Sequence, residues 1–125
     1  MTALSPKFRH VRLKLAREKG HPSGDRQDGY DLVVPLDADN RLDPVEWKEH
    51  RDACRVRRFR PKMNDMRGRL RRKPGGQWFI DYADGDEDDE AGFRFGEARF
   101  VVGEYVSIRD GDDMHTFHVV SVDIP

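Results

Sequence analysis

The sequence predicts a mainly β fold of the α+β type, with about seven antiparallel strands in a curved sheet, a roll or a small barrel, and one short helix around residues 44–53. Three observations lead to this prediction. Short runs alternate between apolar and polar residues, turns containing Gly separate several of the runs, and one stretch carries strong helix-start residues. The 125 residues suffice for one hydrophobic core, so we expect a single domain over 1–125.

The clearest element is a hairpin around the turn Pro74-Gly75-Gly76. A three-residue loop with a left-handed Gly76 places Leu70 opposite Ile80, whereas a two-residue loop places Leu70 opposite Phe79. We favour the three-residue loop because it collects the apolar side chains on one face. The predicted inner face then holds Leu70, Trp78, Ile80 and Tyr82, and the outer face holds Arg69, Arg71, Phe79 and Asp81, with Arg69 opposite Asp81.

Two runs near the N-terminus predict a second hairpin. Residues 8–17 alternate in hydropathy and predict a strand with a cationic outer face. Residues 18–29 are polar and rich in Gly, so we expect a loop there. A strand follows over 30–36, and Pro35 indicates that it lies at a sheet edge or is ending.

A strand over 55–60 is expected to be irregular. The spacing of three between Val56 and Phe59 breaks strict alternation. We therefore expect a bulge or a strand end near Arg57 and Arg58.

The last two strands are expected over 104–109 and 114–123, joined by a hairpin turn at Asp110-Gly111-Asp112-Asp113. Val119 and Val120 are adjacent apolar residues in the second of them. This strand is therefore either buried on both faces or bulged.

The helix prediction depends on a short group of start signals. Asp43 can cap the helix, Pro44 suits its first position, and Glu46 completes a capping box. The helix should extend from Pro44 to about Ala53, with Trp47 on its inner side.

Charge is strongly segregated along a chain whose net charge is only −1. Residues 51–73 contain eleven Lys or Arg and two Asp, whereas residues 81–90 contain seven acidic residues and no basic one. Such blocks are typical of interaction surfaces or solvated segments. We expect residues 1–7 to be flexible and residues 83–92 to form a mobile acidic loop, and that loop could itself neutralise the basic strands.

Several classes of protein are disfavoured. The lone Cys54 excludes a disulfide or a cysteine-based zinc cluster within one chain. No signal peptide or long apolar segment is present, so we expect a cytoplasmic protein without membrane spans.

Catalytic motifs are missing, and an enzyme is the less favoured hypothesis. The chain has no nucleophile elbow and no phosphate-binding Gly-rich loop. His21 and Asp81 are the two acid–base candidates, but His21 has no evident partner and Asp81 is expected to face outward. We assign no catalytic residue.

No cofactor or metal site is predicted either. His115 and His118 should point to opposite faces of a strand. The acidic run from Asp84 has Asp89 where a calcium loop needs Gly and Phe95 where it needs Glu.

The arginine-rich strands are the main functional signal. Arginine binds phosphate through two planar donors, and an aromatic ring among basic residues can stack on unpaired bases. The candidate binding residues are Arg55, Arg57, Arg58, Arg69, Arg71, Lys73 and Phe79.

Three functions remain open. The favoured one is a small bacterial binding domain for an anionic partner, either single-stranded nucleic acid or an acidic protein segment. The second is an accessory subunit whose acidic loop docks on a basic protein partner. The third is a small-ligand enzyme that uses His21 or Asp81. The sequence does not indicate an oligomeric state.

Several segments, spread over most of the chain, form a recognisable pattern. They are Gly29-Tyr30, Pro35-Leu36-Asp37, Leu42-Asp43 with Trp47, residues 54–59, Gly75-Gly76-Gln77-Trp78, residues 103–108, and Phe117 with Val119. Together they resemble a family of small uncharacterised alpha-proteobacterial proteins with no assigned function. That family's pattern has histidines near Arg72 and Ala98, which this chain lacks, so the resemblance implies no functional residue.

Overall fold

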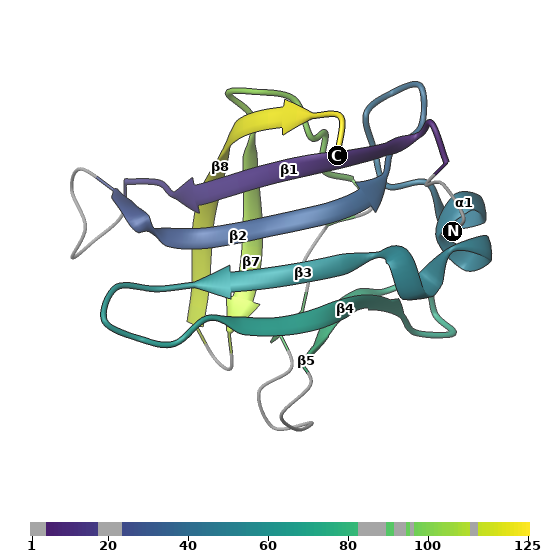
Figure 1. The fold of residues 1–125 in the computed structure, drawn as a ribbon. Helices are drawn as coiled ribbons and strands as arrows, with labels where there is room; N and C mark the ends of the chain where they lie inside the picture. Colours follow the sequence, from purple (N-terminus) through teal and green to yellow (C-terminus); the bar gives the residue numbers. More distant parts are fainter. Residues whose placement is uncertain (1–4, 18–23, 83–89, 92–94, 96, 111–112) are drawn as a thin grey trace.

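The protein is a curled antiparallel sheet with a short helical segment, as the sequence predicted (Figure 1). In the computed structural model each strand pairs with its neighbours in sequence, and β8 also pairs with β1, so the sheet closes into a barrel. The structure describes residues 5–17, 24–82, 90–91, 95, 97–110 and 113–125. Its elements are β1 (Phe8–Leu15), β2 (Asp25–Pro35), α1 (Pro44–Glu49), the 3₁₀ turn η1 (Arg51–Ala53), β3 (Arg55–Phe59), β4 (Met66–Arg72), β5 (Trp78–Tyr82), β6 (Glu90–Ala91), β7 (Tyr105–Asp110) and β8 (Asp113–Asp123).

The strands form two layers around an apolar interior. Figure 1 shows β1 to β4 as neighbouring strands, with β7 and β8 crossing behind them and α1 beside one end. Aromatic rings meet edge to face inside, with 5.0 Å between the ring centroids of Tyr30 and Phe117. No helix within the described residues has the length and apolar run that a membrane span requires. The most deeply buried side chains include Phe8, Val11, Leu13, Leu32, Val34, Leu70, Ile80, Phe95, Phe100 and Ile108.

The β4–β5 hairpin has the predicted three-residue register. Leu70 pairs with Ile80, and the Lys73 amide donates to the Gln77 carbonyl at 2.8 Å. Gly76 has a φ of 91°, which favours glycine. This register sends Leu70, Trp78, Ile80 and Tyr82 into the interior and leaves the basic side chains of β4 outside.

Strand β2 begins at Asp25, within the loop predicted over 18–29. Lys14 of β1 pairs with Gly29, but the next pair joins Leu15 to Asp25, so the extra residues of β2 lie in an irregularity. A Cβ at Gly29 would lie 1.9 Å from the Leu13 carbonyl oxygen. Residues 25–28 were predicted as a loop because they are polar, and they are polar because their side chains are largely solvated.

The bulge predicted in β3 is absent, since all five of its residues pair in regular register with β2. Strict alternation therefore continues, and it places Val56 and Arg58 on the inner side. Arg58 is only 5% exposed. Of the two alternatives foreseen, the strand end is the one observed, since β3 ends at Phe59, directly after Arg58. The spacing of Val56 and Phe59 suggested a bulge because an arginine, and not an apolar residue, occupies the inner position between them.

Arg58 fills one end of the barrel. Its guanidinium carbon lies 4.5 Å from the centroid of the Tyr30 ring and 5.5 Å from that of Phe117. It also donates to the Asp28 carboxylate, and to the Gly29 carbonyl at 3.1 Å. A buried guanidinium is tolerated here because a carboxylate, carbonyls and two ring faces replace its water.

The predicted helical segment is present in two parts, because the α-helix α1 ends at Glu49 and the 3₁₀ turn η1 covers Arg51–Ala53. The Asp43 side chain accepts from the Val45 and Glu46 amides at 3.1 Å, as expected of a cap. The reciprocal half of the capping box is not formed, because the Asp43 amide donates to the Pro35 carbonyl instead. The Trp47 indole donates to the Leu70 carbonyl at 2.9 Å and holds α1 against β4.

Cys54 lies directly after η1 and is fully buried. Its Sγ lies 3.5 Å from the His50 carbonyl oxygen. Burial raises the pKa of the Cys54 thiol to about 12, against the smaller lowering effect of Arg71. The thiol is therefore protonated at neutral pH.

Two further predictions have different outcomes. Val119 pairs with Leu13 whereas Ser121 pairs with Arg12, so Val120 is the extra residue of a bulge, one of the two alternatives foreseen. Within the predicted acidic loop, Glu90–Ala91 form the short strand β6. Residues 83–89 and 92 lie outside the described residues, as do residues 1–4 of the predicted flexible lead-in.

Replacing Arg58 should strongly destabilise the protein. Arg58→Ala leaves Asp28 and its neighbouring carbonyls without their buried cation, so we expect the free energy of unfolding to fall by about 3 kcal/mol. Urea unfolding measures this loss. The matched control is Arg55→Ala on the exposed side of the same strand, and an equal loss in both variants would contradict the buried role.

Candidate anion-binding face

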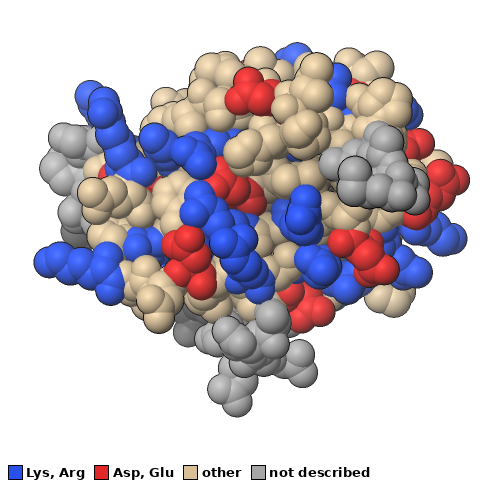
Figure 2. Space-filling view, viewed as in Figure 1, with Lys and Arg blue, Asp and Glu red and all other residues tan. Residues whose placement is uncertain are grey.

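Outward side chains of β1 to β5 line up in two rows across the sheet. We call the outward basic residues of β3 and β4, together with Lys73 directly after β4, the arginine face, which consists of Arg55, Arg57, Arg67, Arg69, Arg71 and Lys73. Figure 2 shows Lys and Arg side chains gathered on the side of the barrel that faces the viewer in Figure 1, with acidic side chains between them. One row is Arg12, Asp31, Arg57 and Arg67, and the next is His10, Val33, Arg55, Arg69 and Asp81.

A hollow of about 410 Å³ lies between these rows. We call it the arginine hollow. Arginines of β3 and β4 and the residues Asp31 and Val33 of β2 line it, together with His10 of β1. Four arginines thus converge on one depression of the sheet: Arg55, Arg57, Arg67 and Arg69.

Asp31 is the acidic centre of the hollow. Its carboxylate accepts from Arg12 Nε at 2.8 Å, binds the Arg57 guanidinium, and lies 3.1 Å from His10 Nε2. Arg57 also contacts Asp65 at 2.9 Å. The charge of Arg57 is therefore balanced by Asp31 and Asp65, and its main role is structural.

The hydrogen bonds around Asp31 control its ionisation. Burial alone raises the pKa of this carboxyl, but the hydrogen bonds from Arg12 and Arg57 outweigh burial and hold the pKa below its ordinary value of 3.8. The same contact with Asp31 raises the pKa of Arg57. Asp31 is consequently an anion at neutral pH, bound between two cations.

The other three arginines of the hollow differ from Arg57. Arg55, Arg67 and Arg69 are exposed, and no ion pair within the described part of the chain involves them. Arg69 lies opposite Asp81 as predicted. The ion pair of Asp81, however, is with Arg71, at 3.9 Å.

The predicted aromatic platform lies farther along β4 and β5. Phe79 is half-buried and pairs with Arg71 across the strands. The Lys73 ammonium lies 5.6 Å from the centroid of the Phe79 ring. The register therefore confirms the outer face predicted for this hairpin, with Phe79 paired with Arg71 and close to the Lys73 ammonium.

Arg58 is a correction to the predicted binding set. It lies inside the barrel and cannot reach a partner on the outer face. Conversely, His10, Arg12, Asp31 and Arg67 were not predicted. Alternation along β4 could have identified Arg67 as a neighbour of Arg69, but the others required the register between β1, β2 and β3.

Of the two acid–base candidates, the structure describes only Asp81. The Asp81 side chain is 41% exposed on the outer face, and His21 lies outside the described residues. On α1, Glu46, Glu49 and His50 place ligand atoms within 4.8 Å of one another. The 3.7 Å contact between Glu46 and His50 accounts for part of this cluster as a helical ion pair.

No family model matches this chain, and neither a curated protein nor a solved structure matches it.

The Asp31 contacts should contribute stability with a defined pH dependence. Because the folded-state pKa is lowered, this stability is present above the ordinary Asp pKa and is lost as pH falls below about 4. Asp31→Asn should lower the free energy of unfolding by about 1–2 kcal/mol at pH 7, the guanidinium groups being partly solvated.

Urea unfolding between pH 3 and pH 7 measures both effects, and the difference between variant and wild type should shrink toward the acidic end. Asp39→Asn is the control, since the Asp39 side chain is 75% exposed and lies 3.8 Å from its arginine partner. A difference between Asp31→Asn and wild type that does not change with pH would contradict the account.

Proposed function

We propose that this protein binds single-stranded nucleic acid through the arginine face. The observation that carries the proposal is the trio of exposed arginines around the hollow, Arg55, Arg67 and Arg69. Planar guanidinium groups contact two phosphate oxygens at once. A cluster of them on an open sheet is suited to a chain of phosphates.

Spacing along β4 supports a linear ligand. Outward residues of a strand recur every ~6.6 Å, so Arg67, Arg69 and Arg71 form a row of cations parallel to the strand, which Lys73 follows directly after the strand end. A row of this kind can follow an extended backbone over several phosphates.

Phe79 favours nucleic acid over an acidic protein segment. An acidic peptide would use the same guanidinium groups but has no need of an aromatic ring beside them. An aromatic ring beside a cationic groove stacks with bases in any sequence. The ring pairs with Arg71 and lies below the Lys73 ammonium, at the end of the cation row.

Asp31 and Asp81 limit the expected affinity. Each places a carboxylate on the same surface, and the whole chain carries a net charge of −1. Binding should therefore depend on local charge, and it should weaken steeply with salt.

Removing two arginines should weaken binding and its salt dependence together. For Arg67→Gln/Arg69→Gln we expect the slope of log affinity against log salt to decrease in magnitude by about 1.4, since each phosphate contact on a single strand contributes ~0.7. Fluorescence anisotropy with a labelled oligothymidylate of roughly 16 nucleotides measures it.

The matched control is Lys48→Gln/Arg99→Gln, which removes the same charge from exposed positions elsewhere. The control should retain most of the affinity. Equal weakening of both double variants, or binding of the wild type that does not change with salt, would refute the proposal.

A further inference from the structure

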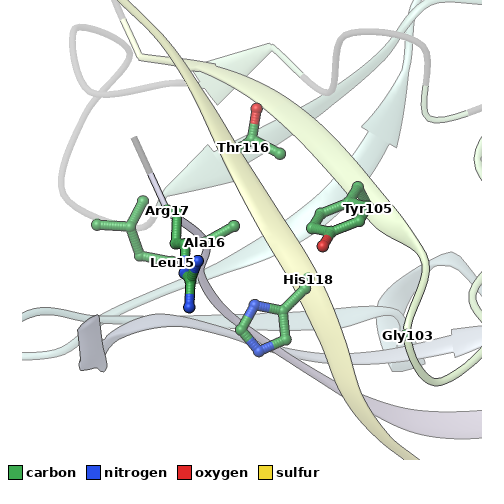
Figure 3. Close-up of a pocket in the computed structure, with 7 residues that line it drawn as sticks. All are labelled: Leu15, Ala16, Arg17, Gly103, Tyr105, Thr116 and His118. Atoms are coloured by element: carbon green, nitrogen blue, oxygen red, sulfur yellow. The ribbon is translucent and has the colours of Figure 1, made fainter. Parts of the chain in front are cut away.

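Two adjoining hollows lie over the outer side of β8, away from the arginine hollow. The first has a volume of about 600 Å³ and is lined by residues of β7, β8 and the end of β1 (Figure 3). The second, of about 430 Å³, lies beside β1 and the start of β2. Leu15 and His118 line both, so the two hollows are neighbours, and we call them together the β8 groove.

Tyr105 gives the first hollow an aromatic wall. It is the first residue of β7, lies directly across from His118 in the strand register, and is 66% exposed. A Cβ built on nearby Gly103, another lining residue, would meet no atom within 4 Å. Open space therefore lies along this wall, and Figure 3 shows the Tyr105 and His118 rings on neighbouring strands.

Basic side chains line the rest of the groove. Lys14 pairs with His118 on the side of the strand away from Tyr105, Arg26 lines the second hollow, and Arg17 lines the first. None of the three forms an ion pair within the described residues. Asp25 is the acidic residue of the groove, and its Oδ1 accepts from the Gln27 amide at 2.8 Å.

From these features we infer that the β8 groove binds a nucleoside monophosphate, a planar ring joined to a phosphate group. The first hollow falls within the volume range of small-ligand sites, roughly 300–1,000 Å³. Tyr105 stacks on the base, His118 and Thr116 offer hydrogen-bonding groups, and the lysine and arginines hold the phosphate. A purely apolar ligand would not use these cations, and inorganic phosphate would not use the ring.

The same chemistry occurs in a free nucleotide and at the end of a nucleic acid strand. The inference does not depend on the arginine face, because none of the residues that line the groove lines the arginine hollow. Variants in each surface can therefore separate the two proposals.

The experiment titrates the full chain with adenosine monophosphate and uridine monophosphate, using amide NMR shifts to locate binding and calorimetry to measure affinity. Adenosine alone and inorganic phosphate are the ligand controls. The expected result is saturable binding, with shift changes centred on Tyr105, Thr116, His118 and Lys14, and weaker binding of each control ligand.

Three variants sharpen the test. Tyr105→Ala should weaken mononucleotide binding at least about fivefold, whereas Tyr105→Phe should retain it because stacking needs only the ring. Lys14→Gln/Arg26→Gln should weaken the mononucleotides and leave adenosine unchanged. Because Tyr105 and Arg26 are exposed, these variants are expected to fold.

Arg67→Gln/Arg69→Gln should bind oligothymidylate more weakly but keep its affinity for the mononucleotides. Loss of mononucleotides in that variant would place their binding on the arginine face and overturn the inference. So would equal affinity for adenosine and its monophosphate, an unchanged affinity in Tyr105→Ala, or no saturable binding below about 1 mM. Preference of an oligonucleotide for the groove, lost with Tyr105→Ala, would identify a strand end as the source of the ligand.

Discussion

Strand register is the constraint on which the rest of this molecule depends. In a closed sheet each residue faces either the interior or the solvent, and a shift of one residue in any hairpin would exchange the two sets. The β4–β5 turn prevents that exchange with a left-handed glycine and a closing pair of backbone hydrogen bonds. In β2 to β5, outward residues pair with outward residues and inward residues pair with inward ones. The same register therefore places the basic side chains together outside and the apolar side chains together in the core.

Much of the fold was accessible from local patterns. The β4–β5 register followed from a Pro-Gly-Gly turn and the distribution of apolar residues, and the helix start followed from Asp43 and Pro44. Local patterns failed to predict structure where contacts between residues distant in sequence define the strand. The stretch before Tyr30 is polar because it lies at the surface, and only its pairing with β1 defines it as a strand.

The candidate site was predictable in part, and for the same physical reason. Arg55, Arg69 and Phe79 lie on outward positions that alternation alone defines. Arg58 was misplaced because hydropathy treats arginine as a surface residue, whereas aromatic faces and a carboxylate can replace water around its guanidinium. Asp31 was missed because its role comes from two arginines and a histidine on two other strands, which are 19 to 26 residues distant in sequence.

The buried Cys54 thiol allows local opening of the native protein to be measured by chemical labelling. A protonated, enclosed sulfur reacts very slowly with electrophiles, since the nucleophile is the thiolate. Modification of Cys54 would therefore require the junction of η1 and β3 to open first. The rate of modification would then report how often this junction opens. Because Cys54 is the only cysteine in the chain, one label would follow the opening of a single, known region of the barrel wall.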